Sequence, residues 1–287
     1  MNIIITGAGG QLANELVATA PTDASVHALS EVDLDIRDRD RVLAAVRERM
    51  PTVIFNAAAY TAVDRAESER DLAFAVNADG ARHLAEASRA VGAYLVHVST
   101  DFVFDGASGT PCDVDATPRP LSVYGASKLA GELAVRGVDP EAAIIRTAWV
   151  YAACGKNFVH TMLRLMKERG AVRVVADQVG SPTHARGLAE ACWRAFERRT
   201  AGTLHWTDAG VASWYDFAVA IAEFGCEANL LPAMPTIEPI RTVDYPTPAE
   251  RPKYSVLDKS STWDALAMRP PHWRIPLQRT IGEIAHA

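Results

Sequence analysis

The chain has 287 residues, of which 49% are hydrophobic and 22% are charged, which is enough apolar material for one core and an appended lobe. Its formal net charge of −6 argues against nucleic acid or an anionic membrane as a partner, because both attract basic surfaces. The four cysteines show no CxxC spacing, so we expect neither a disulfide framework nor a zinc site, and we predict no metal.

The N-terminal segment, residues 1–7, leads into a strand-like apolar run without a basic leader. No later apolar run approaches the roughly 18 residues of a membrane span. We therefore expect a cytoplasmic protein.

Up to residue 150, short apolar runs alternate with segments of helical period. This alternation is typical of parallel strands joined by crossover helices, and the apolar strands fit a sheet covered on both faces. The sequence predicts an α/β fold with a Rossmann-type, doubly wound parallel sheet over residues 1–150. The expected strands are 3–5, 26–29, 53–55, 94–98 and 143–146, and the expected helices are 12–20, 38–50, 72–91 and 124–135.

Beyond Trp149 the alternation becomes irregular, and proline is frequent in 231–252. We expect 151–287 to form mainly a smaller, C-terminal substrate-binding lobe, with a segment near 185–212 returning to the first domain. The proline-rich stretch predicts irregular structure rather than regular elements. The expected elements are helices at 158–167, 188–196 and 214–224 and strands at 172–175 and 203–206.

A glycine-rich segment, 6–13, lies between the first strand and the first helix. Gly7 and Gly10 permit a tight turn and close approach of the backbone to a pyrophosphate, and the following helix offers N–H donors to phosphate. Ala13 is small enough for close packing of helix on strand. The pattern predicts a dinucleotide-binding loop; the alternative is a simple turn.

The end of the second strand informs the choice of cofactor. Ser30 stands where an acidic residue would bind the ribose hydroxyls of NAD, and Glu31 and Asp33 follow. A neutral Ser30 leaves room for a 2′-phosphate, with which Arg37 could pair, although an exposed arginine at a helix start is an equally good interpretation. NADPH is favoured, and NADH stays open.

Tyr124 and Lys128 are four residues apart on a predicted helix and project from one face. A nearby cation favours a phenolate, so we expect Lys128 to lower the pKa of Tyr124 towards neutrality, as suits acid or base catalysis. Thr100 and Asp101 follow the strand 94–98, at the sheet edge where parallel sheets bind ligands. The alternatives are a surface pair for Tyr124 and Lys128, and a capped turn for Ser99, Thr100 and Asp101.

Other residues receive simpler interpretations. The small residues of 56–61 fit close passage of a dinucleotide or close helix packing. His97 is interpreted as a satisfied core histidine and Trp214 as a packing residue. The cations considered first for a nucleotide diphosphate are Lys156, Arg241 and Arg251, with solvated surface charge as the alternative.

Seven segments spread over nearly the whole chain carry a family resemblance: 7–12, 56–64, 99–106, 124–132, 146–151, 177–183 and 245–252. Together they resemble the extended short-chain dehydrogenase/reductase superfamily and, within it, the dTDP-4-dehydrorhamnose reductases. The last two segments discriminate best, because they lie outside the generic cofactor fold.

The resemblance implies NAD(P)H-dependent reduction of the C4 ketone of dTDP-4-dehydro-6-deoxy-L-mannose, a dTDP-sugar. Tyr124 would donate the proton and Lys128 would hold the nicotinamide ribose. The other implied cofactor-binding residues are Gly7, Gly10, Gln11, Leu12, Ser30, Asp35, Ile36, Ala59, Tyr60 and Thr61, with Asp35 and Ile36 flanking the adenine. The implied substrate-binding residues are Thr100, Asp101, Trp149 and Arg251.

The chain also departs from the family pattern. Phe102 stands where tyrosine is common, and Tyr254 replaces an asparagine; neither removes a catalytic group. Some relatives dimerise through a metal held by glutamates. Although Glu15 is present, the C-terminal segment differs, so we do not predict that metal site and only allow for a homodimer.

Three other functions stay open at this point. One is reduction of a different nucleotide-4-ketosugar in a secondary-metabolite pathway, which only the chemistry of the substrate lobe would distinguish. Another is a non-catalytic nucleotide-binding regulatory subunit, against which Tyr124, Lys128 and Thr100 argue. The third is an NAD-retaining epimerase, disfavoured by the neutral Ser30.

Overall fold

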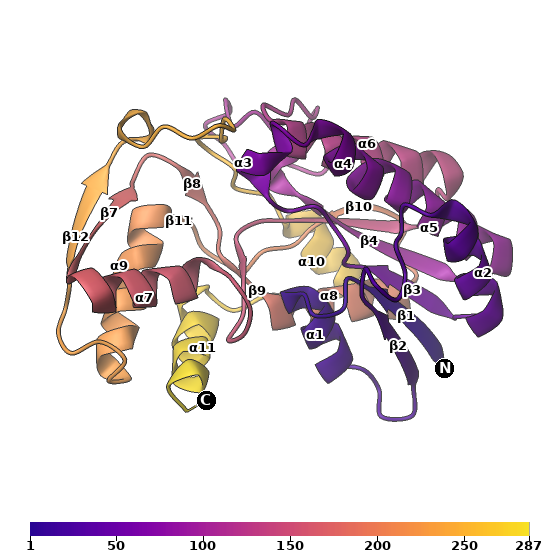
Figure 1. The fold of residues 1–287 in the computed structure, drawn as a ribbon, viewed down its shortest axis with the longest axis horizontal. Coiled ribbons are helices and arrows are strands. Elements are labelled where there is room, and N and C mark those ends of the chain that lie inside the picture. Colours follow the sequence, from indigo (N-terminus) through magenta and orange to yellow (C-terminus); the bar gives the residue numbers. More distant parts are fainter. Residues whose placement is uncertain (287) are drawn as a thin grey trace.

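A computed structural model describes residues 1–286 of the chain. Its centre is a six-stranded sheet, in the order β10-β5-β4-β3-β1-β2, in which every neighbouring pair is parallel (Figure 1). The Rossmann-type doubly wound fold is therefore confirmed. The strands are β1 (Asn2–Thr6), β2 (Ser25–Leu29), β3 (Val53–Asn56), β4 (Tyr94–Thr100), β5 (Ala143–Thr147) and β10 (Gly202–His205).

Helices cover both faces of this sheet. Ile3 and Ile5 of β1 pack towards α1 (Gln11–Ala18) and α8 (Ala185–Arg198) in one core cluster. Ile4, between them, packs into a second cluster on the opposite face. Side chains alternate across a strand, so a central strand buried on both faces needs apolar residues at every position. The helices of the second face are α2 (Arg39–Arg49), α5 (Ala81–Val91) and α6 (Val123–Val138).

The helix expected over 72–91 is not continuous. It consists of α4 (Arg70–Phe74), a π-helical stretch at Ala75–Gly80 and then α5, and it is preceded by the short helix α3 (Val63–Ala66). The expectation assumed one regular 3.6-residue period over 72–91, and a π-helical turn, which is rare, interrupts that period.

The second lobe has its own core between α7 (Phe158–Arg169), α9 (Trp214–Glu227) and α11 (Arg274–His286), on the left in Figure 1. Two strands, β7 (Ala171–Val175) and β12 (Thr236–Ile240), pair in parallel beside these helices. The expectation of irregular structure over 231–252 was therefore wrong for β12. Pro239 is tolerated there because β12 pairs on one side only.

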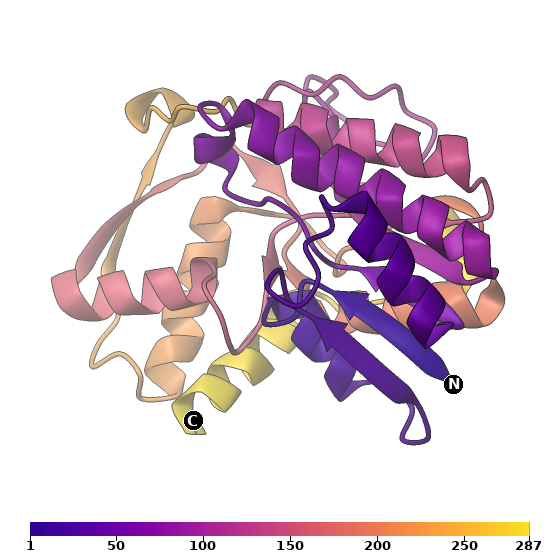
Figure 2. The same ribbon diagram turned by 45° about the vertical axis from the view of Figure 1, so that its right-hand side comes forward.

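Short elements join the two lobes. They are β6 (Val150–Tyr151), paired with β9 (Thr183–His184), and β8 (Val179–Gly180), paired with β11 (Ala212–Ser213). Helix α10 (Ser260–Leu266) packs against the first lobe, where Leu266 joins the core beside α8. Figure 2 shows the two lobes side by side. The division at residue 150, with a return segment at 185–212, stays a prediction. None of the helices within 1–286 is long and apolar enough to cross a membrane.

A buried ion pair fastens α6 to the sheet. Arg146 of β5 donates to both carboxylate oxygens of Glu132, at 2.9 Å from Nε and 2.7 Å from Nη2, and the two residues are only 3% and 1% exposed. Ser99 of β4 donates to the same carboxylate at 2.6 Å. Removal of one partner would leave an uncompensated charge in the core.

We therefore expect Arg146→Met to lower the free energy of unfolding by about 3–5 kcal/mol. The double variant Arg146→Met/Glu132→Leu should recover at least half of that loss, because no buried charge is left. Urea unfolding followed by circular dichroism measures both. The matched control is Arg164→Ala, which breaks an exposed pair with Glu168 and should cost about 0.5 kcal/mol or less. Equal losses in all three variants would contradict this account.

Candidate active site

The glycine-rich loop brings two strand ends into close contact. Gly7 has φ +77°, and Gly10 N–H donates to the Gly7 carbonyl at 3.0 Å, which closes the turn in front of α1. A Cβ on Gly7 would lie 2.8 Å from both Ala57 O and Ala58 N, just after β3. The start of α1, where backbone amides can bind an anion, follows directly after this turn.

The residues after β3 are held by Asn77, which the sequence analysis did not single out. Its side chain accepts from Tyr60 N–H at 2.9 Å and donates to the Tyr60 carbonyl at 3.1 Å. It also donates to the Ser127 hydroxyl at 2.9 Å, on α6. Asn77 lies in the π-helical stretch, which the sequence pattern did not predict, and this is why its role was missed. One buried amide thus joins the loop 57–61 to the helix that carries Tyr124 and Lys128.

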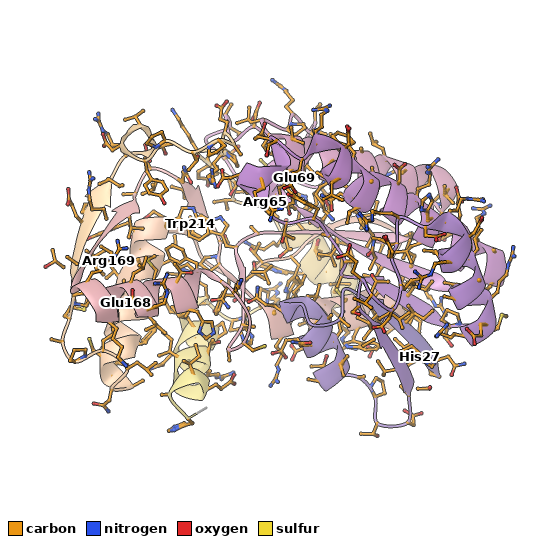
Figure 3. All side chains as sticks on the ribbon, viewed as in Figure 1. His27, Arg65, Glu69, Glu168, Arg169 and Trp214 are labelled. Carbon is orange, nitrogen blue, oxygen red and sulfur yellow. The ribbon has the colours of Figure 1, made fainter. Side chains whose placement is uncertain are left out.

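The rim of this region is charged. The Tyr60 hydroxyl donates to Glu69 at 2.6 Å, and Arg65 pairs with the same carboxylate at 2.6 Å. Figure 3 shows Arg65 and Glu69 together above the sheet. The hydrogen bonds from Tyr60 and Arg65 lower the pKa of Glu69, so the carboxylate is ionised at neutral pH.

The end of β2 is rich in carboxylates. Ser30 donates from its hydroxyl to Asp33 at 2.6 Å. Arg37 lies against Asp35 at 2.7 Å and against Glu31 at 3.1 Å, and the hydrogen bond from Arg37 lowers the pKa of Asp35. Arg37 is thus engaged by two carboxylates, a feature that bears on recognition of a 2′-phosphate.

Tyr124 and Lys128 lie in the first two turns of α6, which begins after Ser122, the residue whose hydroxyl accepts from Gly125 N–H. Lys128 is 2% exposed, and its Nζ donates to the Val98 carbonyl at 2.7 Å. Burial lowers the pKa of Lys128 to about 8, and the nearby Glu132 carboxylate opposes this change.

The expected lowering of the Tyr124 pKa is wrong in direction. Burial raises the pKa of the Tyr124 phenol to about 12, and the neighbouring Thr100 hydroxyl only partly opposes this. The desolvation of the phenolate dominates, and the Asp101 carboxylate also raises the pKa of Tyr124. Tyr124 is therefore a neutral phenol at physiological pH, the form that can donate a proton.

Thr100 and Asp101 adjoin the phenol and also cap a turn. The Thr100 hydroxyl accepts from Phe102 N–H at 3.2 Å and donates to Asp101 Oδ1 at 3.0 Å, at the start of a 3-10 turn over Asp101–Val103. Burial raises the pKa of Asp101 to about 6. The ring of Phe102 meets that of Tyr124 edge to face at 5.4 Å. Capping accounts for part of the Ser99-Thr100-Asp101 pattern.

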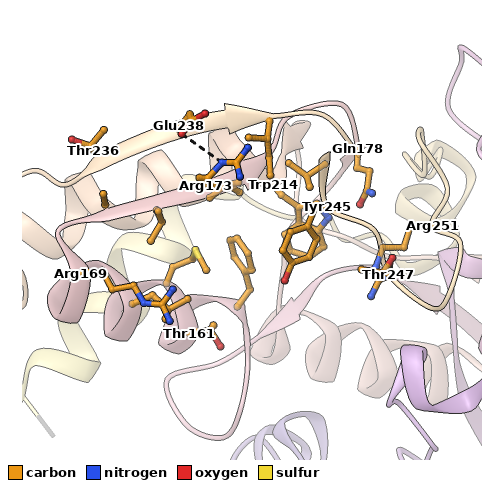
Figure 4. A pocket seen from close by; sticks show the side chains of 18 of the residues that line it. Thr161, Arg169, Arg173, Gln178, Trp214, Thr236, Glu238, Tyr245, Thr247 and Arg251 are labelled. Carbon is orange, nitrogen blue, oxygen red and sulfur yellow. Dashed lines mark hydrogen bonds and ion pairs between the residues drawn. The ribbon is translucent and has the colours of Figure 1, made fainter. Parts of the chain in front are cut away.

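A cavity of about 820 Å³ opens in the second lobe, between α7, β7, β12 and the loop 245–251 (Figure 4). Arg251 lines it and pairs with Asp64 at 2.8 Å. Arg169 and Arg173, which the sequence analysis passed over, also line it. Of the other cations considered, Arg241 pairs with Asp244 instead. The polar and aromatic lining includes Phe158, Thr161, Gln178, Trp214, Tyr245 and Thr247.

Two tryptophans stack beside this cavity. The rings of Trp149 and Trp214 lie parallel, with centroids 3.6 Å apart and 9° between their planes. Trp149 has a left-handed backbone, with φ +50°, and Gly180 packs closely against its indole. Trp214 packs against the core of the second lobe, as expected, and it also lines the cavity.

The sequence and the structure of this chain are similar to those of one known protein family. The family model described as the RmlD substrate binding domain matches residues 1–286. A dTDP-4-dehydrorhamnose reductase of Streptomyces griseus is 44% identical over 96% of this chain and 91% of its own. The crystal structure of the Clostridium acetobutylicum dTDP-4-dehydrorhamnose reductase aligns with a TM-score of 0.94 at 38% identity, over 99% of both chains. That of the Bacillus anthracis enzyme, in complex with NADP, gives 0.92 at 39% identity, over 98% of this chain and 99% of its own.

The glycine loop yields a matched pair of variants. Gly9 has φ +87° but nothing lies within 4 Å of its would-be Cβ, whereas Gly7 combines a positive φ with close backbone neighbours. We expect Gly9→Ala to lower the free energy of unfolding by about 1–2 kcal/mol, from backbone strain alone. Gly7→Ala should lower it by clearly more, because the loop and β3 must separate. Denaturant unfolding compares the two, and equal losses would contradict the close contact.

Proposed function

The chain belongs to the RmlD substrate binding domain family, and on that premise we propose that it is a dTDP-4-dehydrorhamnose reductase. The reaction is NAD(P)H-dependent reduction of the C4 ketone of dTDP-4-dehydro-6-deoxy-L-mannose to dTDP-L-rhamnose. The observation that carries the proposal is the buried Lys128 one helical turn from a neutral Tyr124, on a helix that Ser127 and Asn77 join to the loop 57–61.

The loop geometry fits a dinucleotide. At Gly7 a Cβ would overlap the backbone after β3, so glycine permits this close approach, and the start of α1 would receive the pyrophosphate. When bound, the reduced nicotinamide supplies the hydride. Residues of the loop and strand ends would hold the rest of the cofactor: Gly10, Gln11 and Leu12 the pyrophosphate, Ala59, Tyr60 and Thr61 the central part, Ser30, Asp35 and Ile36 the adenosine, and Lys128 the nicotinamide ribose.

We propose NADPH as the main donor, with NADH also accepted. A relative of this family, the Bacillus anthracis enzyme, is bound to NADP. Ser30 offers a neutral hydroxyl at the ribose position. Arg37 would break its ion pair with Glu31, whose side chain is 77% exposed, and would pair with the 2′-phosphate instead. The shorter contact with Asp35 can stay in place during this exchange.

The proton comes from Tyr124. With its pKa raised to about 12 the phenol holds its proton until the sugar oxygen becomes strongly basic, as hydride arrives at C4. Thr100 and Asp101 would orient the sugar beside it. The Lys128 ammonium stabilises the phenolate that Tyr124 leaves behind.

The cavity of the second lobe suits the nucleotide. Its volume lies within the range of about 300–1,000 Å³ typical of ligand sites. Three arginines against two carboxylates give its lining an excess of one positive charge, and the Arg173 pair with Glu238 is loose at 3.5 Å. Arg169 and Arg173 would attract the diphosphate, with Arg251 at the end towards the first lobe. The stacked Trp149 and Trp214 would lie between this cavity and the sugar.

A different nucleotide-4-ketosugar would use the same catalytic residues, so the identity of the sugar rests on the family match. A regulatory subunit would not need a protonated phenol beside a buried lysine, which favours the enzyme. A cytoplasmic location and a homodimer stay predictions.

Tyr124→Phe should keep the fold and the cofactor affinity, the latter within about twofold, while kcat falls by about 10²–10⁴, because only the proton donor is lost. Oxidation of NADPH with the ketosugar measures kcat, and nicotinamide fluorescence measures cofactor binding. Tyr215→Phe, on α9, is the matched control and should retain full turnover. Normal turnover by Tyr124→Phe would refute the role of the phenol.

The pH profile tests the lysine. Because burial lowers the pKa of Lys128 to about 8, the ammonium is present below that pH and is lost above it. We expect kcat/KM to fall above about pH 8, approaching tenfold per pH unit. A rate constant that stays level to pH 10 in the native enzyme would contradict a working ammonium. Lys128→Met should have a low rate without this alkaline limb.

A further inference from the structure

A proline-rich strap connects the two lobes beside the cavity. It comprises residues 241–252, which follow β12 and run towards α3 of the first lobe (Figures 1 and 2). Its three prolines lack an N–H group and restrict the backbone, so the strap has few donors of its own. Val243 and Tyr245, in its middle, are 73% and 59% exposed. The middle of the strap is thus open to solvent, and its position depends on its two ends.

Each end of the strap is anchored by an aspartate. At the end in the second lobe, Asp177 accepts from the Thr242 N–H and from the Thr242 hydroxyl, both at 2.7 Å. At the other end, Asp64 of α3 accepts from Arg251 Nη1 at 3.0 Å and Nη2 at 2.8 Å, and from Ala249 N–H at 3.2 Å. Among residues 1–286, every hydrogen bond from the strap to the first lobe goes to Asp64. One carboxylate of the first lobe thus fixes this end of the strap.

The strap also folds around the guanidinium of Arg251. Besides Asp64, Nη1 donates to the Thr247 hydroxyl at 2.6 Å and to the Ala249 carbonyl at 3.0 Å. A guanidinium presents its N–H donors in a planar fork. The inner donors of Nη1 and Nη2 face Asp64, and the outer donor of Nη1 faces the strap. Nε–H and the outer donor of Nη2, which form the remaining edge, have no protein acceptor in the described part of the chain.

The remaining edge of Arg251 suits a pair of anionic oxygens, because two parallel N–H donors match a phosphate or a carboxylate. The Arg251 side chain lines the cavity and is 24% exposed, so a ligand in the cavity can reach it. Asp64 lines the cavity too, but both of its oxygens are bonded and Arg251 balances its charge, which limits repulsion of an anion. Figure 4 shows Arg251 beside Thr247, at the opposite end of the cavity from Arg169.

We propose that Asp64 is a positioning residue that holds the free edge of Arg251 towards the diphosphate of the nucleotide sugar. This rests on the proposed function, in which Arg251 is one of the cations around that diphosphate. By bonding the inner edge of the fork, Asp64 restricts the rotamers of a long side chain before the ligand arrives, so less entropy is lost on binding. The ligand then meets two donors in a fixed plane.

Binding of dTDP without turnover tests this role. Asp64→Asn keeps the shape of the side chain, but its amide sets an N–H group against a guanidinium N–H, so the fork loses its fixed plane. We expect the dissociation constant of dTDP, measured by calorimetry, to rise about tenfold, the size expected for one hydrogen bond to a charged group. Thymidine, which has no phosphate, should bind as it does to the native chain. Glu197→Gln, which breaks an exposed pair with Arg194, is the matched control and should change neither constant.

Two further full-length variants separate the positioning of Arg251 from the anchoring of the strap. In Arg251→Met the fork is absent, so adding Asp64→Asn should weaken the binding of dTDP no further. Arg251→Lys can still pair with Asp64 but has no planar edge. It should therefore bind dTDP about as weakly as Asp64→Asn does, while its midpoint of urea unfolding stays close to the native value. Circular dichroism checks that each variant is folded.

Turnover provides a second readout. In Asp64→Asn the KM for the ketosugar should rise about tenfold, while kcat and the dissociation constant of NADPH change by less than about twofold, because the hydride donor and Tyr124 are untouched. Equal weakening of dTDP and thymidine, tighter binding of dTDP, or a further loss in the Arg251→Met background would overturn the inference. A native chain that binds dTDP but reduces no ketosugar would instead overturn the proposed function.

Discussion

The burial of Lys128 against the end of β4 is the constraint from which the rest of the site follows. Its Nζ bonds to the Val98 carbonyl at 2.7 Å, one helical turn before Glu132 reaches Ser99 and Arg146. Placing an ammonium in a dry interior disfavours its charged form unless polar groups surround it. The contacts of α6 with β4 and β5 hold it there, and the result is a lysine that can lose its proton near physiological pH.

Asn77 extends this constraint to the loop 57–61, which follows β3. By bonding both backbone groups of Tyr60 and the Ser127 hydroxyl, it makes the loop after β3 and the first turns of α6 one rigid unit. The π-helical stretch supplies the backbone geometry that puts one amide within reach of both. A dinucleotide bound to that loop would therefore have a fixed position relative to Tyr124 and Lys128, and the second lobe would not be needed to set it.

The sequence predicted what depends on pattern and missed what depends on tertiary context. Strands buried on both faces are continuous apolar runs, so the sheet up to β5 and the helices α1, α2 and α6 were predicted well. A π-helical turn is rare and was not expected, and β12 contains a proline because its free edge needs no donor. Helices α10 and α11 were not anticipated at all. Arg169 and Arg173 are indistinguishable from surface charges in a sequence, because only the pairing of β7 with β12 brings them around one cavity.

The wrong expectation about Tyr124 is the most instructive, because the reversed direction explains the chemistry better. If Lys128 had lowered the pKa of the phenol, part of Tyr124 would be ionised and unable to donate a proton. Burial instead raises the pKa of Tyr124 to about 12 and lowers that of Lys128 to about 8. A phenolate formed beside this ammonium is the stronger base, so transfer of a proton from Lys128 to Tyr124 is downhill. In the proposed mechanism, the same desolvation that keeps Tyr124 protonated before hydride transfer would also favour its reprotonation by Lys128 afterwards.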